Sequence, residues 1–241
     1  MGTIVIGKII DRARVTLLEL DSSMTPDPTN TRWNRVGDLL EHANAAQREI
    51  VAVKPDACAR SVDYVLQAGA KQGLPDDGVA FLGVEHNLGA DGATPGDAIS
   101  IASRDFLGRA DRKWMTATGA AVQRFIFDQR VPKVWYCYPR PVGTWHVNLI
   151  YSAVPTAVAA ANIDDANNGK IDVDDLYDTA IHDYIVGYAL LKNSKAGEPN
   201  KADYFLAKFY NCLGRRYQGQ AANAPLDPEA AEAAPDAPGK P

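Results

Sequence analysis

Cysteine is scarce in this sequence. The 241 residues include only three cysteines, Cys58, Cys137 and Cys212, which are far apart and form no CxxC pair. A disulfide framework or a structural zinc site needs more cysteines at closer spacing. The sequence therefore predicts buried, reduced thiols with no reactive role.

Long apolar runs are missing as well. Near the N-terminus the longest one is Ile4-Val5-Ile6, and Gly7 and Lys8 end it. Such a run is much shorter than a signal sequence or a membrane span requires. We therefore expect a protein that has no membrane partner and stays in the compartment where it is made.

The chain has no excess of positive charge. It contains 25 basic and 30 acidic residues, for a formal net charge of −5, and 46% of its residues are hydrophobic. Binding nucleic acid through its phosphates requires a basic surface, so this class of protein is disfavoured. A protein that only surrounds DNA is not excluded. The hydrophobic content is ordinary for a globular protein and excludes disorder throughout.

Common catalytic signatures are also absent. The sequence has no GxGxxG after a strand, no GxxxxGK[ST], no HExxH and no GxSxG, so the usual dinucleotide, nucleotide, zinc and serine-hydrolase sites are not indicated. Isolated histidines are more often structural than catalytic, and the four here are scattered: His42, His86, His146 and His182. The sequence predicts no cofactor and no enzymatic activity. An enzyme of another type is kept only as the third possible function, after the two described below.

The clearest pattern that is present lies in residues 125–155. Aromatic and β-branched residues dominate residues 134–138 and 145–151, as in half-buried strands. Pro139, Pro141 and Gly143 lie between these two runs and favour a hairpin loop. Residues 122–127 supply a further strand, so we expect an antiparallel meander.

Helical periodicity flanks this region on both sides. Apolar residues recur every three or four positions in residues 6–20, 36–50, 177–191 and 202–213, and Pro55 ends the second of these helices. Helices, then sheet, then helices predict an α+β fold, in which N- and C-terminal helical hairpins form a bundle with an inserted antiparallel β domain. The predicted boundaries are 1–57 and 156–217 for the two halves of the helical domain, 58–155 for the β domain and 218–241 for a C-terminal tail.

The C-terminal tail differs in composition from the rest of the chain. Residues 218–241 contain almost no large apolar side chain and many alanines, prolines and acidic residues. Such a segment buries too little surface to offset the entropy of ordering, so we expect it to be disordered in isolation.

One loop resembles a calcium-binding EF-hand loop. In residues 164–175 an Asp stands first, an Asn fifth, a Gly sixth and an acid twelfth, which suggests Asp164, Asn168, Asp172 and Asp175 as ligands. Against a calcium site, the third position is Ala166 and the twelfth residue is Asp rather than the expected Glu. The alternative is an Asx turn followed by acidic residues that cap the next helix.

Several aromatic and basic residues are candidates for protein contacts. Trp33 precedes a helix and is either a core anchor or an interface residue. The strand aromatics near residue 136 divide between a core and a subunit contact. The full set of interface candidates is Trp33, Trp135, Tyr138, Arg215, Arg216 and Tyr217.

Ten short segments carry a recognisable pattern in a fixed order: 39–51, 54–57, 73–78, 86–92, 125–128, 132–133, 136–139, 151–155, 183–189 and 209–214. Together they resemble the head-to-tail adaptor, or neck, proteins of short-tailed bacteriophages. The resemblance covers roughly residues 12–216, and its specificity lies in the order and spacing of the set. The sequence departs from the family pattern at Asn167-Asn168-Gly169 and after Tyr217.

The resemblance implies a structural virion protein. Such an adaptor forms a ring of twelve copies between the portal ring and the tail nozzle or tube, and genomic DNA passes through its channel without sequence-specific binding. It is assembled in the host cytoplasm and catalyses no reaction. We hypothesise that an acidic channel wall repels the DNA backbone. We also hypothesise that residues 218–241 become ordered on docking against the portal or a neighbouring copy.

Overall fold

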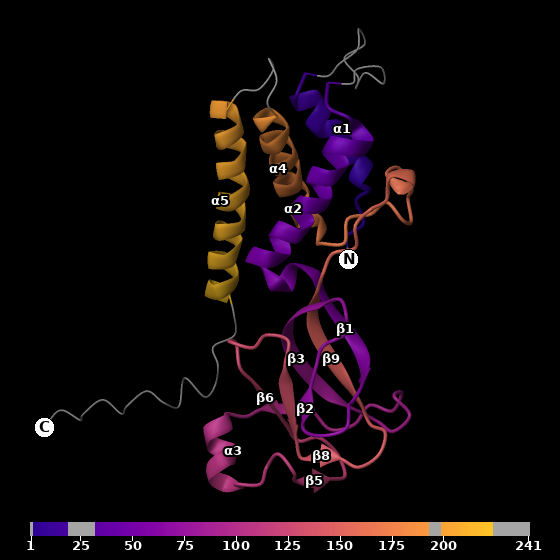
Figure 1. The fold of residues 1–241 in the computed structure, drawn as a ribbon, viewed down its shortest axis with the longest axis vertical. Helices are drawn as coiled ribbons and strands as arrows, with labels where there is room; N and C mark the ends of the chain where they lie inside the picture. Colours follow the sequence, from indigo (N-terminus) through magenta and orange to yellow (C-terminus); the bar gives the residue numbers. More distant parts are fainter. Residues whose placement is uncertain (1, 19–31, 193–198, 224–241) are drawn as a thin grey trace, which may run out of the picture.

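A helical part and a β part lie end to end in this protein (Figure 1). The computed structural model describes residues 2–18, 32–192 and 199–223, with side chains as far as Gly214. The N- and C-terminal segments belong to the helical part, and the residues between them form the β part. The structure therefore confirms an α+β fold in which sheets interrupt a set of helices.

The helical part is arranged around one apolar helix. It contains α1 (Ile6–Thr16), α2 (Leu40–Val53), α4 (Asp178–Leu191) and α5 (Pro199–Asn223). Helix α4 packs against the other three, whereas α1 and α2 have few contacts with each other. A helix that is apolar on most sides belongs in the interior, and α4 buries Ala180, Ile181, Tyr184, Ile185, Val186, Ala189 and Leu190. The N-terminal pair is therefore held together mainly through α4 and not as a closely packed hairpin.

Local sequence explains where α2 begins and ends. A π-helical turn, Arg35–Leu39, leads into it. The Asn34 side chain caps this turn by accepting hydrogen bonds from the backbone N–H groups of Val36 and Gly37 at 3.0 and 3.1 Å. At the other end Pro55 follows the C-cap Lys54 and opens a short 3₁₀ turn, Pro55–Cys58. The predicted stop at this proline is confirmed.

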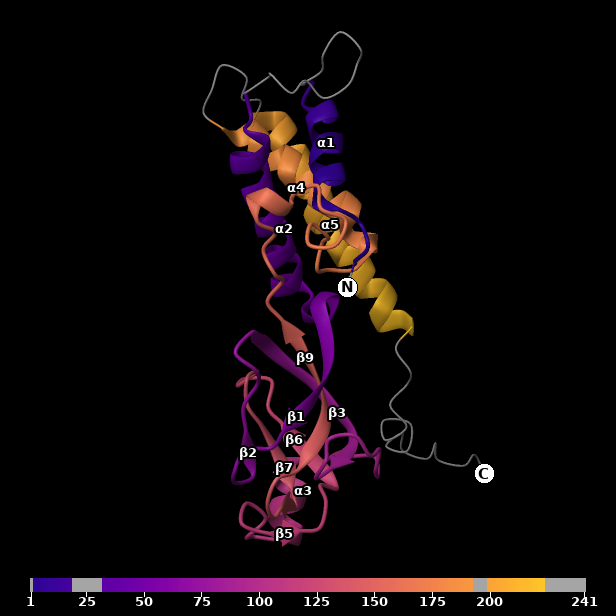
Figure 2. The same cartoon turned by 90° about the vertical axis from the view of Figure 1, so that its right-hand side faces the viewer.

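The first sheet is antiparallel and has β9 at its centre. Strand β9 (His146–Ala153) pairs on one edge with β1 (Ala59–Val65) and on the other with β3 (Gly78–Gly89). Its C-terminal end points toward the helices (Figure 2). Strand β1 leaves the helical part and β9 returns to it side by side, since Ala59 pairs with Ser152.

The second sheet is mixed. Its order is β2 (Lys71–Gln72), β7 (Trp135–Tyr138), β6 (Arg124–Phe127) and β4 (Ser100–Ile101), and β4 runs parallel to β6. A separate parallel pair joins β5 (Thr118–Gly119) to β8 (Arg140–Pro141), and α3 (Arg104–Ala110) follows β4. The expectation of a wholly antiparallel β domain is therefore wrong for these two pairs.

The predicted hairpin between residues 134–138 and 145–151 does not form. Strand β6 pairs with β7 as expected, but β7 and β9 belong to different sheets. Both edges of β9 are occupied by β1 and β3, so it has no edge to offer to β7. The proline-containing connection forms β8 instead, which pairs with β5.

One continuous apolar core joins the helices to both sheets. In the β part Trp135 is fully buried and stacks on Phe81, with 5.4 Å between ring centroids. A smaller cluster under α3 consists of Ala102, Leu107, Trp114 and Ile126. Because Trp135 and Phe81 come from different sheets, their contact fixes how the two sheets face each other.

Helix α5 continues through Asn223, beyond the predicted start of the tail at residue 218. The rest of the predicted tail, residues 224–241, lies outside the described residues. In the described part of the chain no helix combines the length and the apolar character needed to cross a membrane.

A glycine sets the approach of α4 to α5, which suggests a test. A Cβ added at Gly187 of α4 would lie 2.8 Å from Cγ and Cδ2 of Leu206 in α5, whereas one at Gly214 meets nothing within 4 Å. We expect Gly187→Val to lower the free energy of unfolding by about 1–3 kcal/mol relative to Gly214→Val, because overpacking forces the helices apart. Urea denaturation measures the difference, and equal stabilities would contradict this packing.

Candidate functional site

The acidic side chains of the EF-hand-like loop bind separate partners and do not converge on one point where a metal ion could sit. Asp164 accepts hydrogen bonds from both terminal nitrogens of Arg35, at 2.6 and 2.9 Å, and Arg35 also binds Asp11. The hydrogen bond from Arg35 holds the pKa of Asp164 below its ordinary value, and the two carboxylates raise the pKa of Arg35. This contact ties the loop to α1 and to the turn before α2.

The other predicted ligands are equally engaged. Asp175 accepts hydrogen bonds from the backbone N–H groups of Thr3 and Ile4, at 2.6 and 3.0 Å, and Asn168 donates to Asp165 at 2.9 Å. Asp172 binds residues of the β part, described below. Among the residues that the structure describes, no three His, Cys, Asp or Glu side chains come together in a way that suits a metal ion.

The alternative interpretation of this loop agrees with its geometry. Asp165 accepts hydrogen bonds from the backbone N–H of Asn167 at 2.7 Å and of Asn168 at 3.3 Å, which is an Asx turn. Asp174 accepts from the N–H of Leu176 at 2.8 Å and caps the 3₁₀ turn that leads into α4. The Asx turn is therefore confirmed, and the predicted acidic cap acts on this 3₁₀ turn, because no side chain caps α4 itself.

An arginine joins the two parts of the molecule at the waist, where β1 and β9 meet the helices. Arg60, near the start of β1, places one nitrogen 2.6 Å from Asp77 and the other 2.7 Å from Asp172. The Asp172 side chain is nearly buried and also accepts from the N–H of Thr156 at 2.8 Å. Asp77 accepts in addition from the hydroxyl of Tyr151 at 3.0 Å. We call these residues the waist cluster.

Two residues of α2 extend the waist cluster into the helical part. The Asn44 side chain exchanges two hydrogen bonds with the backbone of Val158, at 3.0 and 3.1 Å. The buried side-chain oxygen of Gln47 accepts from the N–H of Asp172 at 2.7 Å. The segment that follows β9 is thus held between α2 and β1. This arrangement restricts movement of the β part relative to the helices.

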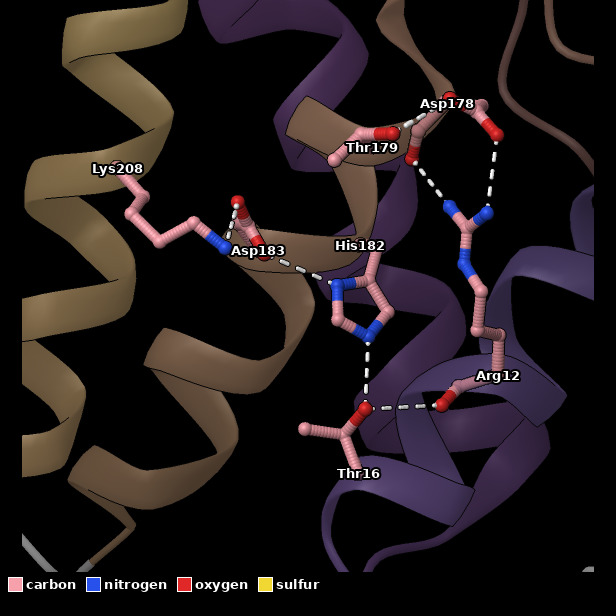
Figure 3. Close-up of polar contacts among 7 residues, drawn as sticks. All are labelled: Arg12, Thr16, Asp178, Thr179, His182, Asp183 and Lys208. Carbon is pink, nitrogen blue, oxygen red and sulfur yellow. Dashed lines mark hydrogen bonds and ion pairs between the residues drawn. The ribbon is translucent and has the colours of Figure 1, made fainter.

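A second polar network holds α1 and α5 onto α4 (Figure 3). On the α1 side Arg12 binds the carboxylate of Asp178 at 3.0 Å, and Thr16 lies 2.9 Å from Nε2 of His182. The other ring nitrogen of His182 lies 3.0 Å from Asp183.

Asp183 carries this network to α5. Its side chain is only 4% exposed, and Nζ of Lys208 lies 3.2 Å from one of its oxygens. A buried carboxylate needs such partners to offset its desolvation. The three helices are therefore fixed in register by polar contacts as well as by apolar packing.

The predicted interface residues fall into three groups. Trp33 is 2% exposed and donates a hydrogen bond to the carbonyl of Ala189, and Trp135 is fully buried, so both are core residues in this chain. Tyr138 is half-buried against the small cluster under α3. Arg215, Arg216 and Tyr217 lie in α5, and their side chains are outside the described part.

The three cysteines are free thiols, as predicted. Cys58 and Cys137 are buried and Cys212 is half-buried. Burial raises the pKa of Cys58 and raises that of Cys137 to about 11. Both buried thiols are therefore protonated near neutral pH and unreactive.

A surface that the sequence interpretation missed surrounds α3. Phe106 and Ile101 are 56% and 63% exposed, and the guanidinium groups of Arg104 and Arg124 lie over the rings of Tyr136 and Phe106. The clustering of arginines among exposed apolar residues in 101–115 was the available signal. The net charge of the whole chain, −5, concealed this local excess of positive charge.

Comparison with known proteins matches nearly the whole chain to one family. A family model described as SU10 adaptor protein matches residues 6–229 and thus spans both the helical and the β part. No curated protein matches the chain.

The waist cluster can be tested by removing one carboxylate. We expect Asp172→Ala to lower the free energy of unfolding by about 1–3 kcal/mol, because Arg60 loses a charged partner and the Thr156 N–H loses its acceptor. The matched control is Asp76→Ala, an exposed aspartate next to Asp77. Chemical denaturation measures both variants, and an Asp172→Ala variant as stable as the control would contradict the role of this cluster.

The loop geometry also predicts the response to calcium. Because the carboxylates of Asp164, Asp172 and Asp175 already bind Arg35, Arg60 and the Thr3 backbone, we expect millimolar CaCl₂ to leave the melting temperature unchanged relative to MgCl₂. Differential scanning calorimetry makes the measurement. A calcium-specific rise in melting temperature that Asp164→Asn abolishes would restore the EF-hand interpretation.

Proposed function

Because the chain belongs to the SU10 adaptor protein family of bacteriophage head-to-tail adaptors, we propose that it is the subunit of a ring that joins the portal to the tail. In this proposal twelve copies sit between the portal ring and the tail nozzle or tube and surround the channel through which DNA passes. Membership of a structural adaptor family implies a protein of the virion neck without an enzymatic role.

The observation that carries this proposal is the extent of the family match. Residues 6–229 include all the described helices and strands, so both parts of the molecule belong to the adaptor unit. A match confined to one part would leave the other free for an unrelated role.

The shape of the molecule supports a joining role. The helical and β parts form opposite ends of an elongated molecule (Figures 1 and 2). One subunit therefore presents different surfaces to two neighbours along its length. The waist cluster and the shared apolar core hold the two ends in a fixed relation.

The channel wall is part of the same proposal. The chain has a formal net charge of −5, and we place acidic surface toward the channel because it repels the phosphate backbone and lets DNA slide. Residues 99–144 carry eight basic and three acidic residues, a net charge of +5, so this segment is the exception. We place it away from the DNA.

Mixing the protein with the portal of the same phage tests the proposal. We expect native mass spectrometry of purified portal rings with an excess of this chain to show one complex, with the mass of the portal plus twelve copies. An unrelated acidic protein of similar size serves as the control and leaves the portal mass unchanged. A portal mass that stays the same with the adaptor would refute the joining role, and a stoichiometry other than twelve would refute only the copy number.

A further inference from the structure

Charge is divided unevenly within the β part. Residues 59–98 contain two basic and six acidic residues, a net charge of −4, whereas residues 99–144 have a net charge of +5. In Figure 1 α3 lies on one side of the β part and the connection that follows β3 lies on the other. The two segments of the β part therefore differ in the sign of their net charge, and α3 and this connection lie on different sides.

The basic side is built around α3. Phe106 and Met115, 56% and 49% exposed, supply apolar surface between the cations. We define the basic face as these two residues together with Arg104, Arg109, Arg112, Lys113 and Arg124.

The cations of the basic face form no ion pair with any residue that the structure describes. In residues 99–144 the only ion pair among described side chains joins Arg130 to Asp128. In the helical part and the waist, by contrast, Arg12, Arg35, Arg60, Lys192 and Lys208 all bind aspartates. Unpaired cations around exposed apolar side chains indicate a surface that an acidic partner covers.

Two arginines of the basic face are partly preorganised. Arg104 lies 5.4 Å from the centroid of Tyr136, and Arg124 lies 5.8 Å from that of Phe106. Stacking on a ring limits the freedom of a guanidinium and leaves its edge open for a carboxylate. The entropy lost on forming an ion pair is reduced accordingly.

The acidic side lies over the ends of β1 and β3. Asp63 and Val65 alternate onto the outer face of β1, and Val65 is 51% exposed. Glu85 and Asp97 are exposed on backbone segments that pair with each other, since the N–H of Ile99 binds the carbonyl of Glu85 and that of Asn87 binds the carbonyl of Asp97. We define the acidic face as Asp63, Val65, Glu85, Asp91 and Asp97.

Asp91 is charged at any pH near neutral. Its carboxylate accepts hydrogen bonds from the hydroxyl and the N–H of Thr94 and from the N–H of Ala93. These bonds, the Thr94 hydroxyl first, hold the pKa of Asp91 below its ordinary value. The acidic face thus presents a fixed anion.

We propose that the basic face of one copy docks on the acidic face of the next copy around the ring. A ring of more than two copies needs a heterologous interface, in which two different surfaces of one chain are complementary. The β part provides such a pair on opposite sides. This inference rests on the proposed ring and names the surfaces that close it.

A second copy fits the basic face better than DNA does. Arginine, phenylalanine and methionine are enriched at protein interfaces, and apolar side chains exposed among the cations gain nothing from a phosphate backbone. The rest of the chain is acidic and repels DNA, whereas its own acidic face supplies carboxylates. Binding of duplex DNA to the basic face is kept as an outcome of the test.

Matched charge reversals test the contact. Variant A carries Arg109→Glu and Lys113→Glu on the basic face, variant B carries Glu85→Lys and Asp97→Lys on the acidic face, and a control carries Lys8→Glu and Arg48→Glu on the helices. All six positions are exposed, so we expect melting temperatures close to that of the wild type.

Self-association is measured by sedimentation of the free chain and by native mass spectrometry on portal rings. We expect A alone and B alone to need about tenfold more protein than the wild type or the control to assemble. An equimolar mixture of A and B should recover wild-type assembly, because the reversed face of each variant then meets an oppositely charged face of the other.

The outcomes separate this inference from the proposed function. If the wild type fills the portal but mixing A with B brings no recovery, the two faces do not meet and the adaptor role stands. If the wild type never binds the portal while the mixture still recovers association of the free chain, the adaptor role fails and the contact stands. If only A is impaired, and A also loses binding to a fluorescent duplex that B retains, the basic face binds DNA and the inference is wrong.

Discussion

The pairing of β9 on both of its edges is the constraint on which the rest of the structure depends. With β1 on one side and β3 on the other, β9 cannot join β7, and the second sheet must form separately. The pairing also places the strand that leaves the helical part beside the strand that returns to it. Arg60 then lies where Asp77 and Asp172 both reach it, and a salt-bridge cluster closes the waist.

The helical part relies on a different balance of forces. Helix α4 is apolar on most sides and gathers α1, α2 and α5 around it, but apolar packing alone specifies register weakly. The network from Arg12 through His182 and Asp183 to Lys208 supplies directional contacts between these helices. Buried polar groups of this kind tolerate only an arrangement that satisfies them.

The sequence predicted those elements whose pattern is local. The helices followed from apolar spacing, the end of α2 from Pro55, and the strands near residues 126, 136 and 148 from their aromatic and β-branched residues. The pairing of these strands was not predictable in the same way, because a β7–β9 hairpin and the observed arrangement share the same local signals. Only the long-range partners β1 and β3 decide between them.

The contacts of the candidate site were likewise not predictable from local sequence alone. The acidic residues of the EF-hand-like loop suggested ligands or caps, and Ala166 and Asp175 already counted against calcium. The structure adds Arg35 and Arg60 as partners, and these are distant from the loop in sequence. Local pattern left Trp33 and Trp135 open as core or interface residues, and the structure buries both side chains in the core. The two charged faces of the β part were visible only as uneven charge between residues 59–98 and 99–144.

The waist cluster and the shared apolar core make the two ends of the molecule one rigid connector. A distance measured between spin labels on the two ends tests it most directly. The labels go on Tyr204→Cys in α5 and Met115→Cys beyond α3, both exposed positions, in a chain in which Cys212 is replaced by Ser. We expect a single narrow distance distribution in pulsed electron paramagnetic resonance, because a rigid connector holds the two labels at one separation. A broad or two-peaked distribution would contradict it.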